Sequence, residues 1–141
     1  MADLRERVEA EFENIDTVLG QLQSVGEVAG LSPVMLAGVA ALLHSLYNGL
    51  ENVLKQIARA RGLAVSSGAG WHQALLRSVT EVGVIDNSLQ ARLRPYLAFR
   101  HFFVHAYAVQ LDPERISPLI DDAASLVAQF RESVDKAISG E

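Results

Sequence analysis

The chain has 141 residues and a net charge of −5, and half of its residues are apolar. This length fits one compact domain, residues 1–141, and the apolar content excludes a wholly disordered chain. The chain has no cysteine, which excludes a disulfide scaffold, a thiolate zinc site and a cysteine nucleophile, and which fits the reducing cytoplasm. The first fifteen residues carry charges throughout, so we expect no targeting segment. The longest apolar run, residues 33–43, is far shorter than the roughly 18 residues that a membrane span needs, so we expect no span and no membrane partner.

Charge is distributed unevenly along the chain. Residues 1–28 contain seven acidic and two basic side chains, whereas residues 50–105 contain three acidic and seven basic ones. The overall acidity argues against a protein that coats DNA nonspecifically, and we expect no DNA partner. The basic middle segment can still contact phosphates at one place.

The hydrophobic pattern predicts helices throughout and no strands. In residues 4–28 apolar side chains recur at intervals of three and four, which predicts a first helix that ends at Gly30. A second helix is predicted for residues 33–60, with Ser32 as its N-cap and Gly62 as its stop signal.

Three further helices are predicted in the second half. A short third helix starts at Trp71, after a loop of small residues, and ends near Gly83. The fourth is predicted for residues 89–108, with a cap among residues 86–88 and an interior Pro95 that should kink it.

The fifth helix opens at Asp112 and Pro113 and carries an apolar stripe to its end. Five helices with short connections predict an all-α fold, an antiparallel helical bundle.

Polar side chains interrupt the apolar part of the fourth helix. Between Pro95 and Leu111 most residues are apolar, and a cation or imidazole there loses hydration worth several kcal/mol unless it is paired or faces a cleft. These side chains therefore need either internal partners or a function. The four polar residues are Arg100, His101, His105 and Tyr107.

Helical geometry divides these four residues between faces. At about 100° per residue, Arg100 and Tyr107 lie about 20° apart, and the two histidines lie about 40° apart on a neighbouring face. Arg100 and His105 point about 140° apart. Their convergence would require a bent arginine side chain, a distorted helix, or a second copy of the helix across a dimer axis.

Residues 100–107 (RHFFVHAY) resemble the R-x4-H-x-Y motif of HEPN-domain ribonucleases of the HepT toxin type. His101 agrees with the resemblance, because the residue after the arginine of that motif is usually Asn, Asp or His. Two further segments are similar to the same family: residues 46–54 (LYNGLENVL) and 70–76 (GWHQALL). The resemblance extends over roughly residues 35–135 and implies a HEPN-like bundle.

The resemblance implies a homodimeric, metal-independent endoribonuclease in which two motif helices face each other across a cleft. RNA can be cleaved by its own 2'-hydroxyl, which needs a base, an acid for the leaving 5'-oxygen and positive charge on the phosphorane. We expect Arg100 to hold the phosphate and His105 to act as acid or base. His101 is expected to position the substrate or to transfer a second proton. Glu51 and Lys55 of the second helix are candidate supporting residues.

The resemblance also implies a protein partner. In HepT-type systems a minimal nucleotidyltransferase, the antitoxin, uses ATP to AMPylate the tyrosine of the motif, which here is Tyr107. The added phosphates would lie beside Arg100 and compete with RNA. No cofactor is expected for the nuclease itself, since ATP is used by the partner.

Other interpretations of the same residues remain open at this point. The bundle can be a catalytically idle interaction module that binds a nucleotidyltransferase or a nucleotide. His101 and His105, four residues apart, can ligate a metal, although the pair lacks the glutamate of the zincin arrangement and the chain has no cysteine, and we predict no metal. Arg100 can form an ion pair with Glu51, Glu51 can pair with Lys55, and Tyr107 can be an ordinary packed or dimer-interface tyrosine.

Overall fold

The computed structural model describes residues 3–65, 67–105, 107 and 110–140, and over these residues it confirms the all-α prediction. The described residues form five helices and no strand. The helices are α1 (Leu4–Gln23), α2 (Pro33–Ala60), α3 (Trp71–Glu81), α4 (Asn87–His105) and α5 (Pro113–Ser139).

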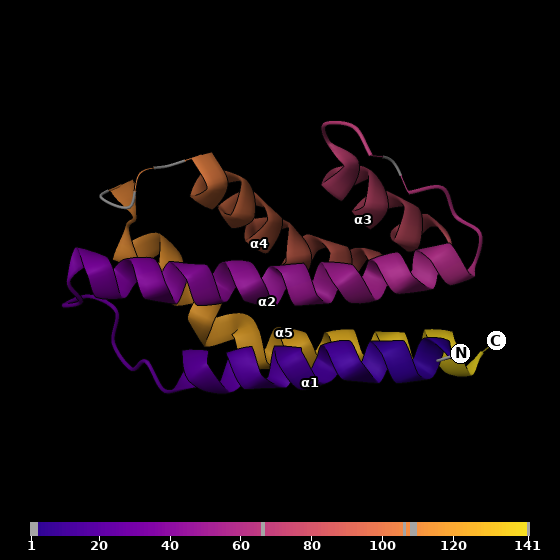
Figure 1. Cartoon of the computed structure of the whole chain (residues 1–141), viewed down its shortest axis with the longest axis horizontal. Helices are drawn as coiled ribbons and strands as arrows, with labels where there is room; N and C mark the ends of the chain where they lie inside the picture. The colour runs from indigo at the N-terminus through magenta and orange to yellow at the C-terminus, as the bar shows by residue number, and fades with distance from the viewer. Residues whose placement is uncertain (1–2, 66, 106, 108–109, 141) are drawn as a thin grey trace.

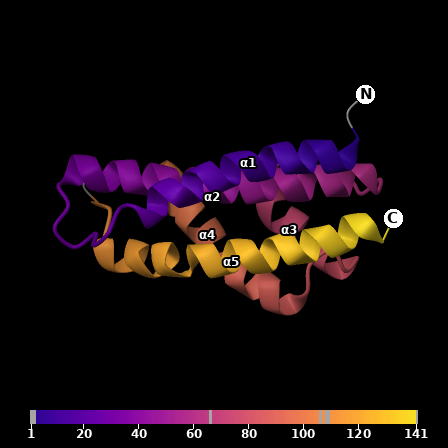
Figure 2. The ribbon, with the colours of Figure 1, turned by 90° about the horizontal axis from the view of Figure 1, so that it is seen from below.

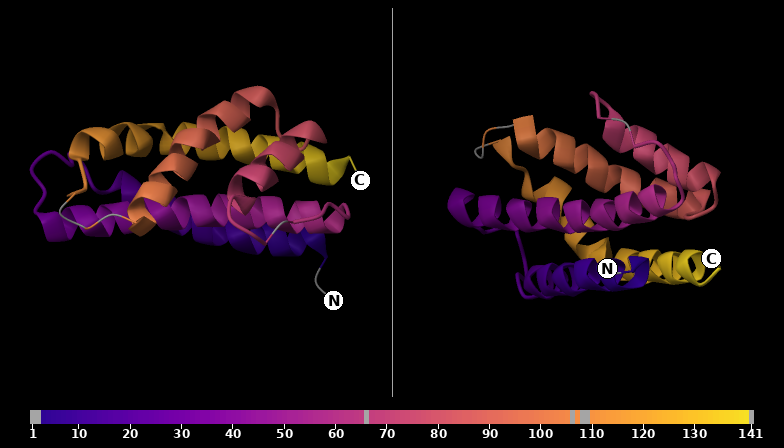
Figure 3. Two further views of the ribbon diagram at one scale, coloured as in Figure 1. Left: turned by 90° about the horizontal axis from the view of Figure 1, so that it is seen from above. Right: turned by 45° about the vertical axis from the view of Figure 1, so that its right-hand side comes forward.

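Helix α2 lies at the centre of the bundle and contacts each of the other four helices (Figure 1). α1 and α5 run side by side along one of its faces (Figure 2), and α3 and α4 lie on the opposite face (Figure 3). α1 and α2 are antiparallel, as are α4 and α5, so both chain ends lie at the same end of the molecule. By length and composition α2 could also cross a membrane, but its contacts with four other helices are those of a core helix.

Most helices begin and end at the residues that the sequence predicted as caps and stop signals. Ser32, Asp86 and Asp112 each accept a hydrogen bond from a backbone amide in the first turn of α2, α4 and α5, at 3.2, 2.8 and 3.0 Å. Such caps satisfy amides that have no partner within the helix. Gly62 follows α2 with a φ of 74°, a conformation that favours glycine. The sequence signals therefore located these boundaries correctly.

The predicted end of the first helix was wrong. α1 ends at Gln23, five residues before the predicted end, and Gly30 does not terminate it. The Ser24 hydroxyl donates a hydrogen bond to the carbonyl oxygen of Gln21 at 2.7 Å, and Gly26 then turns the chain with a φ of 73°. Serine competes with the helical backbone in this way, and the apolar pattern continued past the true end because Val28 is buried outside the helix.

The predicted end of the fourth helix was also wrong. α4 runs through Pro95 but ends at His105, and Tyr107 is not helical. The backbone amide of Tyr107 donates to the side chain of Gln110 at 2.8 Å, and the amide of Gln110 donates back to the carbonyl of Tyr107 at 2.9 Å. This local turn replaces the helical hydrogen bonds, so the expected common helical line of Arg100 and Tyr107 does not exist. Residues 106 and 108 of the predicted helix lie outside the described residues.

The core is built from the predicted apolar stripes. The rings of Phe12 in α1 and Phe130 in α5 meet edge to face with centroids 6.0 Å apart, and both are buried. α1 approaches α2 closely at Gly49, where a Cβ atom would lie 2.7 Å from the Cγ1 atom of Ile15. This packing positions α2, and α2 in turn carries the polar side chains described next.

Candidate functional site

Arg100 points from α4 toward α2. Its Nε donates to the Oδ1 atom of Asn48 at 3.4 Å, and the side chain is half-buried. Within the described residues the other guanidinium nitrogens have no protein acceptor, and the alternative ion pair with Glu51 is not formed. Arg100 is therefore held in place through one nitrogen and keeps two nitrogens for a ligand.

One face of α2 carries three polar side chains, His44, Asn48 and Glu51, spaced by four and three residues. The His44 ring lies 5.2 Å from that of Phe103 in α4, centroid to centroid, and its buried Nε2 has no hydrogen-bond partner in the described structure. Burial, and then the nearby Arg100 guanidinium, lower the pKa of His44, which favours its neutral form. This polar face of α2 contacts the motif segment of α4 through Asn48, which binds Arg100, and through His44, which lies against Phe103.

Glu51 is a buried carboxylate, 4% exposed, that pairs with a histidine of α3. Its Oε2 atom lies 2.7 Å from the Nδ1 atom of His72. The Tyr47 hydroxyl also donates to Glu51; burial, and then the charge of this carboxylate, raise the pKa of Tyr47 above its usual range. Because Glu51 has these partners, its alternative pairing with Lys55 is not formed.

Lys55 and Trp71 fix the start of α3 on α2. The Lys55 Nζ atom lies 4.8 Å from the centre of the Trp71 ring, and the Trp71 and His72 rings stack with centroids 3.7 Å apart. Lys55, a predicted supporting residue, therefore lies over Trp71. It does not line the cleft described below.

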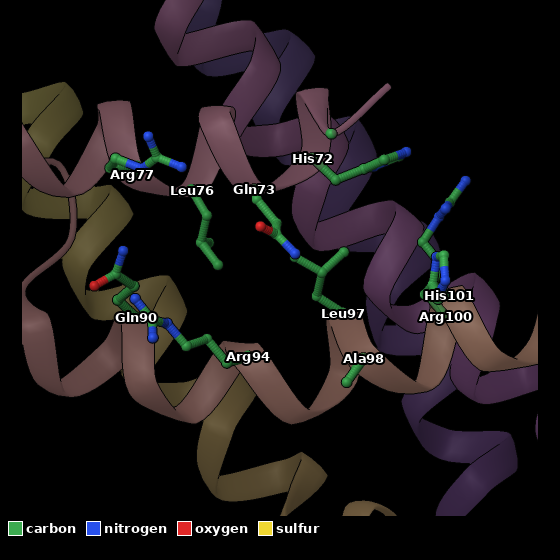
Figure 4. A pocket seen from close by; sticks show the side chains of 11 residues that line it. His72, Gln73, Leu76, Arg77, Gln90, Arg94, Leu97, Ala98, Arg100 and His101 are labelled. Carbon is green, nitrogen blue, oxygen red and sulfur yellow. The ribbon is translucent and has the colours of Figure 1, made fainter. Parts of the chain in front are cut away.

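A cleft of about 630 Å³ lies between α3 and α4 (Figure 4). Its described lining contains three arginines and two histidines and no carboxylate, although the whole chain is acidic. Such a cleft attracts anions, because no acidic side chain offsets the guanidinium groups. The polar side chains divide between its two ends: His72, Arg100 and His101 lie at one end and Arg77, Gln90 and Arg94 at the other.

The two motif histidines form an exposed pair at the end of α4. The ring centroids of His101 and His105 are 4.7 Å apart. His101 lines the cleft beside Arg100, whereas His105 does not. The helical angles predict that Arg100 and His105 point to different sides of α4, and of these two only Arg100 lines the cleft. In the part of the chain that the structure describes, no group of three or more His, Cys, Asp or Glu side chains is placed to hold a metal.

Tyr107 is 78% exposed, so the alternative of a tyrosine packed within the subunit does not hold. Phe102 and Val104, on the last turns of α4, are also exposed. An apolar groove of about 270 Å³ between α4 and α5 adjoins Phe102. The end of α4 thus presents the motif histidines next to uncovered apolar surface.

Sequence reasoning missed part of this arrangement. In the sequence, His72 stands out only as part of the family-like segment 70–76, and Asn48, Arg77 and Arg94 receive no individual role. The available signal was the spacing of polar residues on the apolar α2, together with the position of His72 in the first turn of the helix that follows a loop of small residues.

The chain matches a protein-family model over most of its length. The model described as "HepT-like protein" matches residues 38–140, which span most of α2 and all of α3, α4 and α5. All residues of the cleft and of the motif lie within the match. No curated protein and no solved structure matches the chain.

Proposed function

Because this chain belongs to the HepT-like protein family, we propose that it is an RNA-cleaving toxin, a metal-independent endoribonuclease that works in the cytoplasm as a homodimer. The observation that carries the proposal is the surroundings of Arg100. This arginine has two guanidinium nitrogens without a protein acceptor in the described structure, and it lines the cleft together with His101, whose ring pairs with that of the exposed His105. These are the groups that 2'-hydroxyl attack on RNA requires.

Each group has a role in that reaction. Arg100 binds two phosphate oxygens and stabilises the charge of the phosphorane. His105 exchanges a proton with the 2'-hydroxyl or the 5'-oxygen, and His101 positions the phosphate or transfers the second proton.

A homodimer accounts for the separation of Arg100 and His105. Arg100 lines the α3–α4 cleft and His105 does not, so in this proposal a second copy supplies the missing partner in each site. The exposed Phe102 and Val104, next to His105, support contact between two such helix ends, because exposed apolar clusters mark interaction sites.

The proposal is tested by incubating total RNA with the purified, unmodified protein in EDTA. We expect cleavage to continue, with 2',3'-cyclic phosphate and 5'-hydroxyl ends, because the nucleophile belongs to the RNA and no metal takes part. Cleavage that stops on chelation would favour the metal alternative. No cleavage by protein that mass spectrometry shows to be unmodified would favour the interaction module.

We also propose that Tyr107 is AMPylated by a minimal nucleotidyltransferase antitoxin. The chain has three tyrosines, and Tyr47 and Tyr96 are each only 2% exposed, which leaves Tyr107 as the accessible hydroxyl. AMP phosphates on this side chain, which follows His105 by two residues, would bring negative charge to the end of α4, where they would compete with RNA phosphates.

Co-expression with the antitoxin should add whole AMP units to Tyr107 and abolish RNA cleavage. The measurement is intact mass followed by peptide mapping. Tyr107→Phe is the control, and it should carry no addition and stay active in the presence of the antitoxin. An AMP unit mapped to another residue, or full inhibition of the Tyr107→Phe protein, would contradict this assignment.

A further inference from the structure

We propose that His72, held by Glu51, is the base that takes the proton from the 2'-hydroxyl, and that it acts in the α3–α4 cleft of the same subunit as Arg100. This inference rests on the proposed RNA cleavage. It adds a residue from outside the R-x4-H-x-Y segment, and it places the base and the phosphate clamp on one chain.

The hydrogen bond between His72 and Glu51 determines which ring nitrogen is free. A carboxylate only accepts hydrogen bonds, so the Nδ1 atom of His72, 2.7 Å from the Oε2 atom of Glu51, carries the hydrogen. In the neutral ring, which is the form that can act as a base, the Nε2 atom then has the lone pair. A buried carboxylate that orients a histidine in this way is the arrangement by which enzymes hold an imidazole base.

The surroundings of His72 restrict its ring to one orientation. The Glu51 side chain is 5% exposed and is also bound by Tyr47, so it is fixed within the bundle. The Trp71 ring stacks on one face of the His72 ring. His72 nevertheless keeps 18% of its side chain exposed, and it lines the cleft at the end where Arg100 and His101 lie (Figure 4).

The cleft has the charge and the size for a phosphodiester. Arg77 and Arg94, at its other end, have no hydrogen bond or ion pair within the described ranges, in contrast to Arg92, which is bound to Asp122 at 2.7 Å. Unpaired guanidinium groups without a nearby carboxylate bind phosphate oxygens. A volume of about 630 Å³ falls within the range of small-ligand sites, so the cleft can hold a nucleotide unit next to the bond that is cut.

The proposed step transfers one proton to His72 and one proton to the leaving oxygen. The Nε2 atom of His72 takes the proton of the 2'-hydroxyl while the 2'-oxygen forms a bond to phosphorus. The bond from phosphorus to the 5'-oxygen breaks, and that oxygen receives a proton from the protonated member of the His101–His105 pair. The products are a 2',3'-cyclic phosphate and a 5'-hydroxyl. His72 then releases its proton to solvent, and the histidine that acted as the acid takes one up. No oxidant or reductant is needed.

The test separates the rate of cleavage from the binding of RNA. His72→Gln keeps an amide N–H that can donate to Glu51 but removes the basic ring. We measure single-turnover cleavage at saturating protein, the affinity for a 2'-O-methylated RNA that cannot be cleaved, and thermal unfolding. We expect the cleavage rate to fall by roughly 10²- to 10⁴-fold, as for the loss of a general base, while the affinity stays within about threefold and the unfolding temperature is retained.

The same RNA tests the cleft as the place of binding. Arg94→Ala should weaken the binding of the 2'-O-methylated RNA, and it should reduce the slope of log affinity against log salt by about 0.7, the value for one phosphate contact of a single strand. Arg115→Ala is the matched control, because Arg115 is exposed and lies outside this cleft. Equal affinities of these two variants would contradict binding in the cleft.

The outcomes distinguish this inference from the proposed function. If the wild-type protein cleaves RNA and His72→Gln cleaves it equally fast, His72 only joins α2 to α3, and this inference fails alone. A slower His72→Gln protein with equally reduced affinity and stability would also indicate a structural role. Failure of the unmodified wild-type protein to cleave any RNA would remove both proposals.

Discussion

Arg100→Ala and His105→Ala should each abolish most of the RNA cleavage. Removing a preorganised group that stabilises the charge of a transition state costs about 10²- to 10³-fold in rate, and removing an acid or base costs about 10²- to 10⁴-fold. The Arg100 guanidinium lies at the His101 end of the cleft, whereas Arg77 and Arg94 lie at the other end, so we expect neither to replace its charge at the phosphate. The measurement is the single-turnover cleavage rate of a labelled RNA in EDTA.

Two controls separate chemistry from folding in this experiment. Arg100→Ala removes the hydrogen bond to Asn48, so its unfolding temperature is measured beside its rate. Arg59→Ala is the matched arginine variant, because Arg59 is exposed near the end of α2 and does not line the cleft, and it should cleave at the wild-type rate. Cleavage by His105→Ala at the wild-type rate would refute the role given to that histidine.

A mixture of the two inactive variants tests the dimer directly. If Arg100 of one subunit works with His105 of its partner, mixed dimers contain one site with both residues intact. Mixing Arg100→Ala and His105→Ala protein should therefore restore part of the activity once subunits exchange. A mixture that remains as inactive as its components would argue that each site is built from a single chain.

Phe130→Ala should lower the free energy of unfolding by about 3–5 kcal/mol, the usual cost of emptying a buried aromatic site. Phe130 is fully buried, and its ring meets Phe12 edge to face, so its removal leaves a cavity between α5 and α1. Urea or thermal unfolding followed by circular dichroism gives the change. For a domain of this size, several kcal/mol is a large part of the total stability.

Graded variants check that the loss comes from the cavity. Phe130→Leu keeps more of the buried volume and should cost less than Phe130→Ala. Val82→Ala, at an exposed position after α3, should change stability by no more than about 0.5 kcal/mol. A loss below about 1 kcal/mol for Phe130→Ala would mean that α5 does not depend on this contact, contrary to its buried position.

The sequence alone was sufficient for most of the fold. The five helices followed from hydrophobic spacing, and the caps at Ser32, Asp86 and Asp112 act where polar residues precede the helices. These signals are local, so they can be interpreted without knowledge of the neighbouring helices. The two wrong boundaries arose where other local hydrogen bonds, at Ser24 and Gln110, replaced helical ones.

The motif was also visible in the sequence, because Arg100, His101 and His105 lie on one helix. Their partners were not visible, since a sequence does not show which residues of distant helices meet. Asn48 is 52 residues from Arg100, and His72 is 21 residues from Glu51, yet each pair is in contact. The sequence by itself determined the helices and the cationic segment that supplies the site. Only the packing of α3 and α4 on α2 decided that the buried Glu51 orients His72 and that a cleft without carboxylates opens beside Arg100.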